Sequence, residues 1–104
     1  MARFDVYPHP EAAMRATTPF LLDVQNNFID RVSTRIVVPL RAAAVFGPPM
    51  RDLNPQFEIA GAAVVLDSTA LAAFPVSGLK KSVGSLIDQQ TDILAALDLL
   101  FGSF

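Results

Sequence analysis

The chain has 104 residues and a formal net charge of −2, with 52% hydrophobic and only 17% charged residues. This length allows one domain with a modest core, and so low a charge fraction suggests that a partner, most simply a second copy, covers some of the surface. The acidic balance argues against direct DNA or RNA binding, and the lack of cysteine excludes disulfides and thiolate metal sites.

Residues 1–7 are too polar for a signal peptide, and no apolar run reaches membrane-spanning length, so we expect a cytoplasmic protein without membrane contact. Residues 4–7 alternate apolar and polar side chains and predict a short strand that Pro8-His9-Pro10 ends. The single histidine, His9, falls on this predicted loop. We expect it to be exposed and without a function.

Four further apolar segments predict strands, separated by turn residues. Residues 20–25 are apolar enough for a strand covered on both faces, and residues 35–40 are rich in β-branched side chains. Pro39 predicts that the latter strand ends at an edge or a bulge. Residues 57–66 predict a hairpin that turns at Ala60-Gly61, and residues 74–76 a last short strand.

Residues 41–55 form the one long irregular stretch, with Gly47-Pro48-Pro49 and Asn54-Pro55 as turn signals. No internal repeat or composition change divides the chain, which is therefore read as a single domain over residues 1–104. Short strands followed by one helix predict a mainly β, α+β protein: a curled antiparallel sheet or partial barrel of about five strands, with a C-terminal helix packed against it.

That helix is predicted over residues 88–104, with Ser85 or Asp88 as its N-cap, because apolar side chains recur there at intervals of three and four. Asp98 and the terminal carboxylate lie near its C-terminal end, where the helix dipole disfavours anions. An end so unfavourable by local rules suggests that the helix tip contacts a partner. The alternative is that Phe104 folds back onto the core.

The sequence offers little chemistry. His9 has no evident orienting partner, no acidic residues are spaced to share a metal ion, and the five glycines are isolated from one another, so no phosphate loop is predicted. Ser33-Thr34-Arg35 would suit a phosphate, and the arginines of the connecting segments would suit an acidic peptide, although both are also ordinary surface features. These residues favour a binding protein without metal or cofactor over an enzyme.

Several segments, taken in order, carry a family pattern over nearly the whole chain. They are Phe4-x-Val6-Tyr7, then Leu22-Asp23-Val24-Gln25 with Ile29-Asp30, then Arg35-Ile36-Val37-Val38-Pro39-Leu40, then Pro75-Val76-Ser77, and finally Asp92-Ile93 running to Leu99-Leu100-Phe101. The Asp-Val-Gln block, the Val-Pro-Leu segment and the terminal helix make this set fairly specific. In these features the chain resembles CcdB-type toxins of bacterial toxin–antitoxin modules.

The resemblance implies an SH3-like partial barrel with a C-terminal helix that forms a homodimer. Toxins of this type II system bind the A subunit of DNA gyrase and trap the enzyme on cleaved DNA, without cofactor or catalysis of their own. A small antitoxin with a disordered C-terminal region neutralises them. The resemblance implies that the antitoxin contacts loops such as residues 41–55.

In the family, the gyrase-binding surface combines the final helix, its last three residues and a patch after the Asp-Val-Gln block. The corresponding residues here are Asn26, Phe28, Ile29, Asp98, Gly102, Ser103 and Phe104. Ile29 keeps the family's residue, and Asp98 stands where the family has asparagine. Family toxins end in Trp-Gly-Ile, whereas this chain ends in Gly102-Ser103-Phe104, which leaves Phe104 as the candidate replacement for the tryptophan anchor.

Two alternatives remain at this level. The first is a MazF-like endoribonuclease. Toxins of that kind look like the same barrel and cleave RNA with arginine and hydroxyl groups, for which Arg35 with Thr34, or Arg15 with Thr17, are candidates here. The second alternative is a family member that keeps the fold and antitoxin binding but no longer poisons gyrase. The altered C-terminal tripeptide is the reason to consider it.

Overall fold

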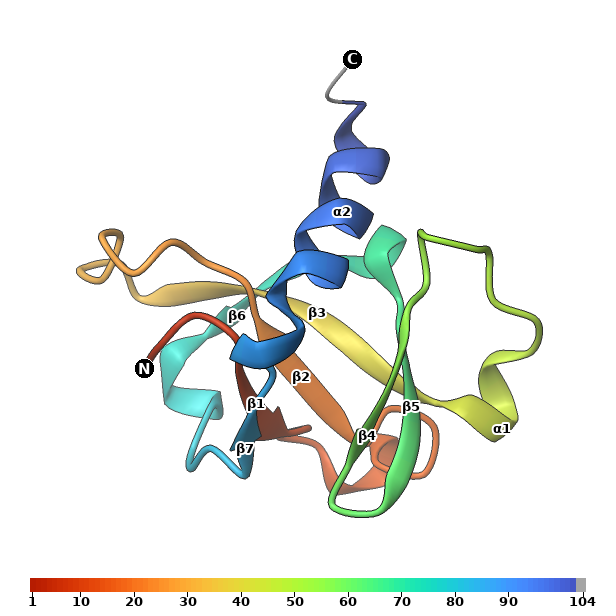
Figure 1. The fold of residues 1–104 in the computed structure, drawn as a ribbon. Coiled ribbons are helices and arrows are strands. Elements are labelled where there is room, and N and C mark those ends of the chain that lie inside the picture. Colours follow the sequence, from red (N-terminus) through yellow and green to blue (C-terminus); the bar gives the residue numbers. More distant parts are fainter. Residues whose placement is uncertain (103–104) are drawn as a thin grey trace.

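The computed structural model describes residues 1–102, in which seven antiparallel strands form one curled sheet beside a C-terminal helix (Figure 1). The strand order is β4-β5-β3-β2-β1-β7, and β6 pairs with β3. The expected mainly β, barrel-like architecture is confirmed. The strands are β1 (Asp5–Pro8), β2 (Phe20–Asp23), β3 (Thr34–Ala42), β4 (Gln56–Ile59), β5 (Ala62–Leu66), β6 (Ala72–Pro75) and β7 (Gly84–Ser85).

Alternating side chains give the sheet two buried faces. On one face Val6 of β1 lies opposite Leu22 of β2, which lies opposite Val38 of β3, and all three are fully buried. This row belongs to the larger core, which the helix covers. On the other face, Tyr7 and Leu21 pack with Val37 and Leu79 in a second, smaller cluster. Because successive strand residues point to opposite faces, the two cores follow directly from the sequence alternation.

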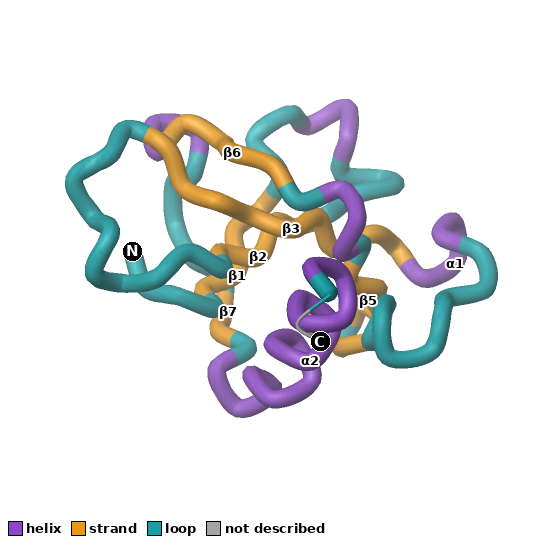
Figure 2. Tube along the Cα trace, turned by 90° about the horizontal axis from the view of Figure 1, so that it is seen from above, coloured by secondary structure: helices purple, strands orange, loops and turns teal. Residues whose placement is uncertain are grey.

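The C-terminal helix α2 (Gln90–Phe101) is set against the concave side of the sheet and projects beyond it (Figures 1 and 2). It buries Ile93, Ala96 and Leu97 in the larger core. The helix is shorter than predicted at both ends. At its start, a 3₁₀ turn η4 (Ile87–Gln89) precedes it. The Ser85 hydroxyl accepts a hydrogen bond from Ile87 N, but the N-cap position of α2 is Gln89, with no side-chain cap, so the predicted N-caps Ser85 and Asp88 are wrong.

At the other end, α2 stops at Phe101. Gly102 adopts the left-handed conformation with a φ of 67°, and its N–H donates to the carbonyl oxygen of Asp98. This is the usual glycine termination of a helix, which satisfies carbonyl groups that a helix end leaves free. The prediction of a helix running to Phe104 is therefore wrong, whereas Asp98 does lie in the last turn of α2, which contains no basic residue. Phe104 itself lies outside the described residues.

Pro39 does not end its strand at an edge or a bulge, as the sequence suggested. It lies inside the nine-residue strand β3, opposite Leu21 of β2. Along its other side β3 pairs with β6 through Val37 and with β5 only from Leu40 onward. Proline is tolerated here because it stands at the change of partner, where its missing N–H leaves no ladder bond unmade.

The connecting segments agree with the sequence in outline. The β4–β5 hairpin turns at Ala60 and Gly61, both with positive φ, as a two-residue type I′ turn requires. The irregular stretch after β3 contains only the short helix α1 (Ala43–Phe46). Three further 3₁₀ turns complete the connections: η1 (Ala12–Met14), η2 (Ser68–Ala70) and η3 (Val76–Gly78). None of the helices within residues 1–102 has the length and apolar character needed to cross a bilayer.

His9 is buried, which corrects the expectation of an exposed side chain. The residue is 6% exposed, and its ring meets the ring of Phe74 edge-on, with the centroids 5.9 Å apart. Nδ1 accepts a hydrogen bond from Glu11 N at 3.1 Å. Burial lowers the pKa of His9 below its usual value. The segment between the two prolines folds back onto β6, so this histidine is a packing residue.

Candidate functional site: a groove between the helix end and the loop after β2

A groove of about 490 Å³ lies between the C-terminal half of α2 and the loop that follows β2. Its floor and walls are mostly apolar, with Arg3, Asn26 and Asp98 among the polar groups that line it. The full lining is Arg3, Val24, Gln25, Asn26, Ile29, Ile36, Leu71, Leu94, Leu97, Asp98 and Phe101. Apolar grooves with a few polar groups are the usual form of binding surfaces.

This groove brings together three of the residues that the resemblance implicates: Asn26, Ile29 and Asp98. They are separated by up to 72 positions in the chain, and only the packing of α2 against the sheet makes them neighbours. Phe28 does not line the groove. Its side chain is 94% exposed at the outer end of the same loop, where it is available to a partner.

Gly102 completes the helix end, and Ser103 and Phe104 lie outside the described residues. Phe101 was not among the predicted contact residues, although it lines the groove and is 68% exposed. An exposed phenylalanine in the last turn of a helix was a signal for a contact residue. Leu94 and Arg3 were also missed, because nothing in the linear sequence places them beside residues 24–29.

The loop after β2 has a defined conformation. The carbonyl oxygen of Asn26 accepts a hydrogen bond from Ile29 N at 3.0 Å, and its side-chain Oδ1 accepts one from Phe28 N at 2.9 Å. Asn27 Oδ1 accepts a hydrogen bond from Arg3 N at 2.7 Å. An asparagine that bonds the backbone two residues ahead is a common turn former. The Asn26 side chain is therefore partly committed to shaping its own loop.

A buried ion pair lies beneath this loop. Arg35 of β3 donates to both carboxylate oxygens of Asp23 in β2, through Nε at 2.8 Å and Nη2 at 2.9 Å. Asp23 is fully buried and Arg35 is 3% exposed. Asp23 pairs across the sheet with Val37, so Arg35 is its diagonal neighbour on the same face. Two-point pairing of this geometry is the arrangement that lets two charges stay buried together.

The ionisable groups around this pair respond to burial. Desolvation raises the pKa of Asp23, while the hydrogen bond from Gln25 N and the contact with Arg35 act in the opposite direction. Burial, together with the nearby Asp5 carboxylate, raises the pKa of Tyr7 to about 12. Both residues lie under the sheet face opposite α2. They support the site but do not line the groove.

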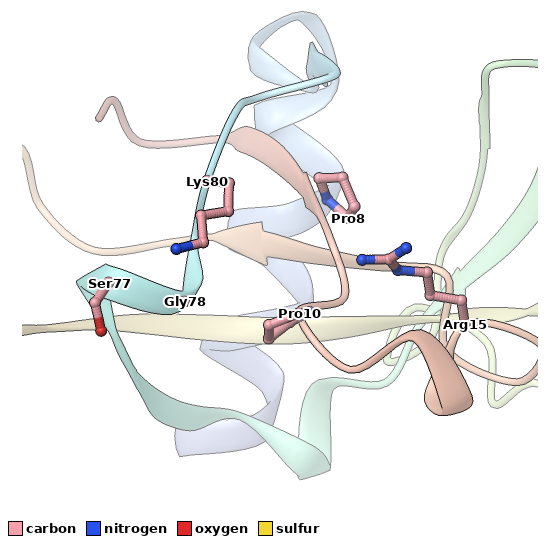
Figure 3. Close-up of a pocket in the computed structure, with 6 residues that line it drawn as sticks. All are labelled: Pro8, Pro10, Arg15, Ser77, Gly78 and Lys80. Carbon is pink, nitrogen blue, oxygen red and sulfur yellow. The ribbon is translucent and has the colours of Figure 1, made fainter.

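A second cavity of about 360 Å³ lies on another part of the surface, lined by Pro8, Pro10, Arg15, Ser77, Gly78 and Lys80 (Figure 3). Arg15 and Lys80 stand on opposite sides of it, and Arg15 Nε donates to the carbonyl oxygen of His9 at 2.7 Å. A third cavity, of about 260 Å³, lies between α2 and the loop of residues 41–55. Neither contains a residue implicated by the resemblance in gyrase binding.

The first candidate for RNA cleavage does not have the required access. Arg35 is buried and paired with Asp23, so its guanidinium group cannot reach an RNA phosphate. Thr17, the proposed companion of Arg15, donates its hydroxyl to the carbonyl oxygen of Met14 at 3.3 Å. Among residues 1–102, no three histidine, aspartate or glutamate side chains gather as a metal ion would require.

The comparison with known protein families agrees with this geometry. The family model described as CcdB protein matches residues 3–102, which is nearly the whole chain. The match includes both parts of the groove, the loop after β2 and the last turns of α2. The chain therefore belongs to the CcdB family, the toxins of bacterial toxin–antitoxin modules.

Proposed function

We propose that this chain is the toxin of a type II toxin–antitoxin module that binds the A subunit of DNA gyrase and traps the gyrase–DNA cleavage complex. The observation that carries the proposal is the groove that joins Asn26 and Ile29 to Asp98. Exposed phenylalanines flank it, Phe28 on the loop and Phe101 on the helix. Aromatic side chains at an interface are frequent energetic hot spots, worth about 2 kcal/mol or more.

The toxin acts by protein–protein contact, as a homodimer, and catalyses no reaction. A small antitoxin, disordered in its C-terminal region, neutralises it by binding the loop of residues 41–55 among other surfaces. The second support for this proposal is composition: 52% hydrophobic residues leave apolar side chains such as Ile29, Met50 and Leu99 at least half exposed in a single copy. A partner chain is the simplest cover for such side chains.

The direct test is capture of the purified chain by immobilised gyrase A subunit, with three proteins compared. These are the full chain, a chain lacking residues 102–104, and a Phe101→Ala variant. We expect the full chain to bind, and both changes to weaken binding at least tenfold, because each removes an aromatic group or the end of the helix that presents it. Binding that survives both changes rejects the helix end as the contact.

A parallel measurement separates the two remaining functions. A chain that binds the antitoxin encoded beside it, but neither binds gyrase A nor arrests growth of a gyrase-competent host, is a family member that has lost gyrase poisoning. Growth arrest that depends on residues 102–104 supports the proposal. Arrest accompanied by RNA cleavage, with gyrase untouched, contradicts it.

A further inference from the structure

The carbonyl oxygen of Ile29 is held from below by two buried side chains. Gln25 Nε2 donates to it at 2.5 Å, and Arg35 Nη1 approaches it at 3.4 Å. Gln25 is 7% exposed and Arg35 is 3% exposed, whereas Ile29 itself is 52% exposed. The exposed residue Ile29 is therefore fixed through its backbone by two side chains that are themselves almost fully buried.

Gln25 joins this loop to the sheet through both ends of its side-chain amide. While Nε2 donates to Ile29, Oε1 accepts a hydrogen bond from Ile36 N of β3 at 2.9 Å. Strand β2 ends at Asp23, two residues earlier than the apolar run suggested, and the Gln25 amide takes the place of the next backbone ladder bond. The position of the loop is thereby tied to the register of β3.

Arg35 is anchored in turn by Asp23. Nε and Nη2 of the guanidinium group donate to the carboxylate, and the remaining nitrogen, Nη1, donates to the Ile29 carbonyl oxygen. Asp23 Oδ1 also accepts a hydrogen bond from Gln25 N at 3.0 Å, so one carboxylate orients both Gln25 and Arg35. Networks in which every member is satisfied are rigid and specify one arrangement.

We infer that Gln25 and Arg35 are positioning residues that hold residues 26–30 in the conformation that docks on the partner, Gln25 from the wall of the groove and Arg35 from beneath it. This inference rests on the proposed function of the groove and adds the means by which its loop wall is kept in place. Ordering a loop before binding removes the entropic cost of ordering it from the binding step. Loss of these hydrogen bonds therefore lowers affinity although the exposed side chains of the loop are unchanged.

The test compares gyrase A binding by Gln25→Met with that of the unchanged chain. Methionine has nearly the volume of glutamine but neither donates to Ile29 nor accepts from Ile36. The matched control is Thr18→Val, two residues before the start of β2. It also replaces a buried polar group, a hydroxyl that accepts a hydrogen bond from Arg41 Nη1 at 2.6 Å. We expect Gln25→Met to raise Kd roughly tenfold and Thr18→Val less than twofold.

A double-mutant cycle with Phe28→Ala separates positioning from a general loss of stability. If Gln25 acts by placing the loop, Phe28→Ala costs less binding in the Gln25→Met background than in the unchanged chain. Additive effects, or a Kd within twofold of the unchanged chain for Gln25→Met, overturn the inference. Should Gln25→Met not fold, Gln25→Glu replaces it: it keeps an acceptor for Ile36 N, removes the donor to Ile29, and sets a carboxylate oxygen against the Ile29 carbonyl oxygen.

Amide hydrogen exchange of the free protein keeps this test separate from that of the proposed function. We expect Gln25→Met to speed exchange in residues 26–31 and to leave the amides of α2 unchanged. Equal exchange in the two proteins overturns the inference even if gyrase binds. Faster loop exchange in a chain whose unchanged form does not bind gyrase A supports the hold on the loop and rejects the proposed function.

Discussion

Tyr7 is the single tyrosine of the chain, and its side chain is 3% exposed on the sheet face that also carries Asp23. Burial, with the Asp5 carboxylate beside the hydroxyl, disfavours the phenolate form and raises the pKa of Tyr7 to about 12. In the unfolded chain the pKa of tyrosine is about 10. The folded pKa is therefore the higher one.

The shift in the pKa of Tyr7 therefore contributes to the free energy of unfolding. This contribution is fully present below pH about 10 and is lost as the pH rises from about 10 toward 12. Spectrophotometric titration measures it directly, because the chain has one tyrosine and no tryptophan. We expect the tyrosinate signal of the folded protein to appear near pH 12, and that of the protein in denaturant near pH 10. Coincident titrations would contradict the burial of Tyr7.

Asp23 and Arg35 show what single residues of the sequence could not reveal. They are 12 positions apart, and no local pattern in the sequence pairs them. Only the register that sets Asp23 opposite Val37 makes Arg35 its diagonal neighbour. The same register removes Arg35 from the surface and places it under the loop of the candidate site.

For His9 the prediction from the sequence was wrong, because a residue expected to be exposed is buried. Two flanking prolines predict a loop, and the loop is present, but loop position was taken to mean exposure. The ring packs on Phe74, 65 residues later in the chain, so its burial depends on a tertiary contact that no local pattern reports.

At the scale of elements, the turn of the β4–β5 hairpin was predicted from Ala60-Gly61. The backbone conformation of this turn is strained at Ala60. Ala60 has a φ of 50°, in the left-handed region that asparagine and glycine adopt more readily than alanine. Asn-Gly is the favoured pair for a type I′ turn. We expect Ala60→Asn to raise the free energy of unfolding by about 0.5–1 kcal/mol, measured by urea denaturation.

The matched control is Ala63→Asn in strand β5 of the same hairpin, also exposed but in extended conformation. Asparagine is disfavoured in strands, so this variant is expected to be slightly less stable than the unchanged protein. If both variants shift stability alike, turn strain at Ala60 is not the cause.

Elements with a strong local pattern were predicted with nearly correct bounds. The first strand, the hairpin and the apolar spacing of α2 are of this kind. Other elements depend on their neighbours. The two-residue β7 exists because it pairs with Asp5 and Val6. Pro39 is tolerated inside β3 because it lies where the neighbouring strand changes from β6 to β5. Helix α2 serves two purposes, since Leu97 belongs to the core and also lines the groove.

At the scale of the whole molecule, the sequence pattern predicted one domain, a curled sheet and the terminal helix, and the family resemblance implied that the helix end and the loop after β2 share a surface. It did not predict the groove itself. The groove is lined by residues of α2 and of the loop after β2, two segments that both extend beyond the sheet (Figure 1). That relation is a property of the packed whole.

The molar mass of the protein in solution tests the proposed homodimer. One chain has a mass of 11.2 kDa, and we expect light scattering coupled to size exclusion to give twice this value at micromolar concentration. The physical reason is the exposed apolar surface of a single copy, which includes the 50% exposed side chain of Leu99. A mass of one chain over the whole concentration range would contradict the proposal.

The central claim is that the end of α2 and the loop after β2 form one docking face for the gyrase A subunit. Hydrogen exchange of this chain with and without gyrase A tests it most directly, because it reports every backbone segment at once. The account predicts slower exchange in residues 26–31 and 94–101 together, with the β4–β5 hairpin unchanged. Protection of only one of these segments, or protection confined to the hairpin or to residues 41–55, would contradict it.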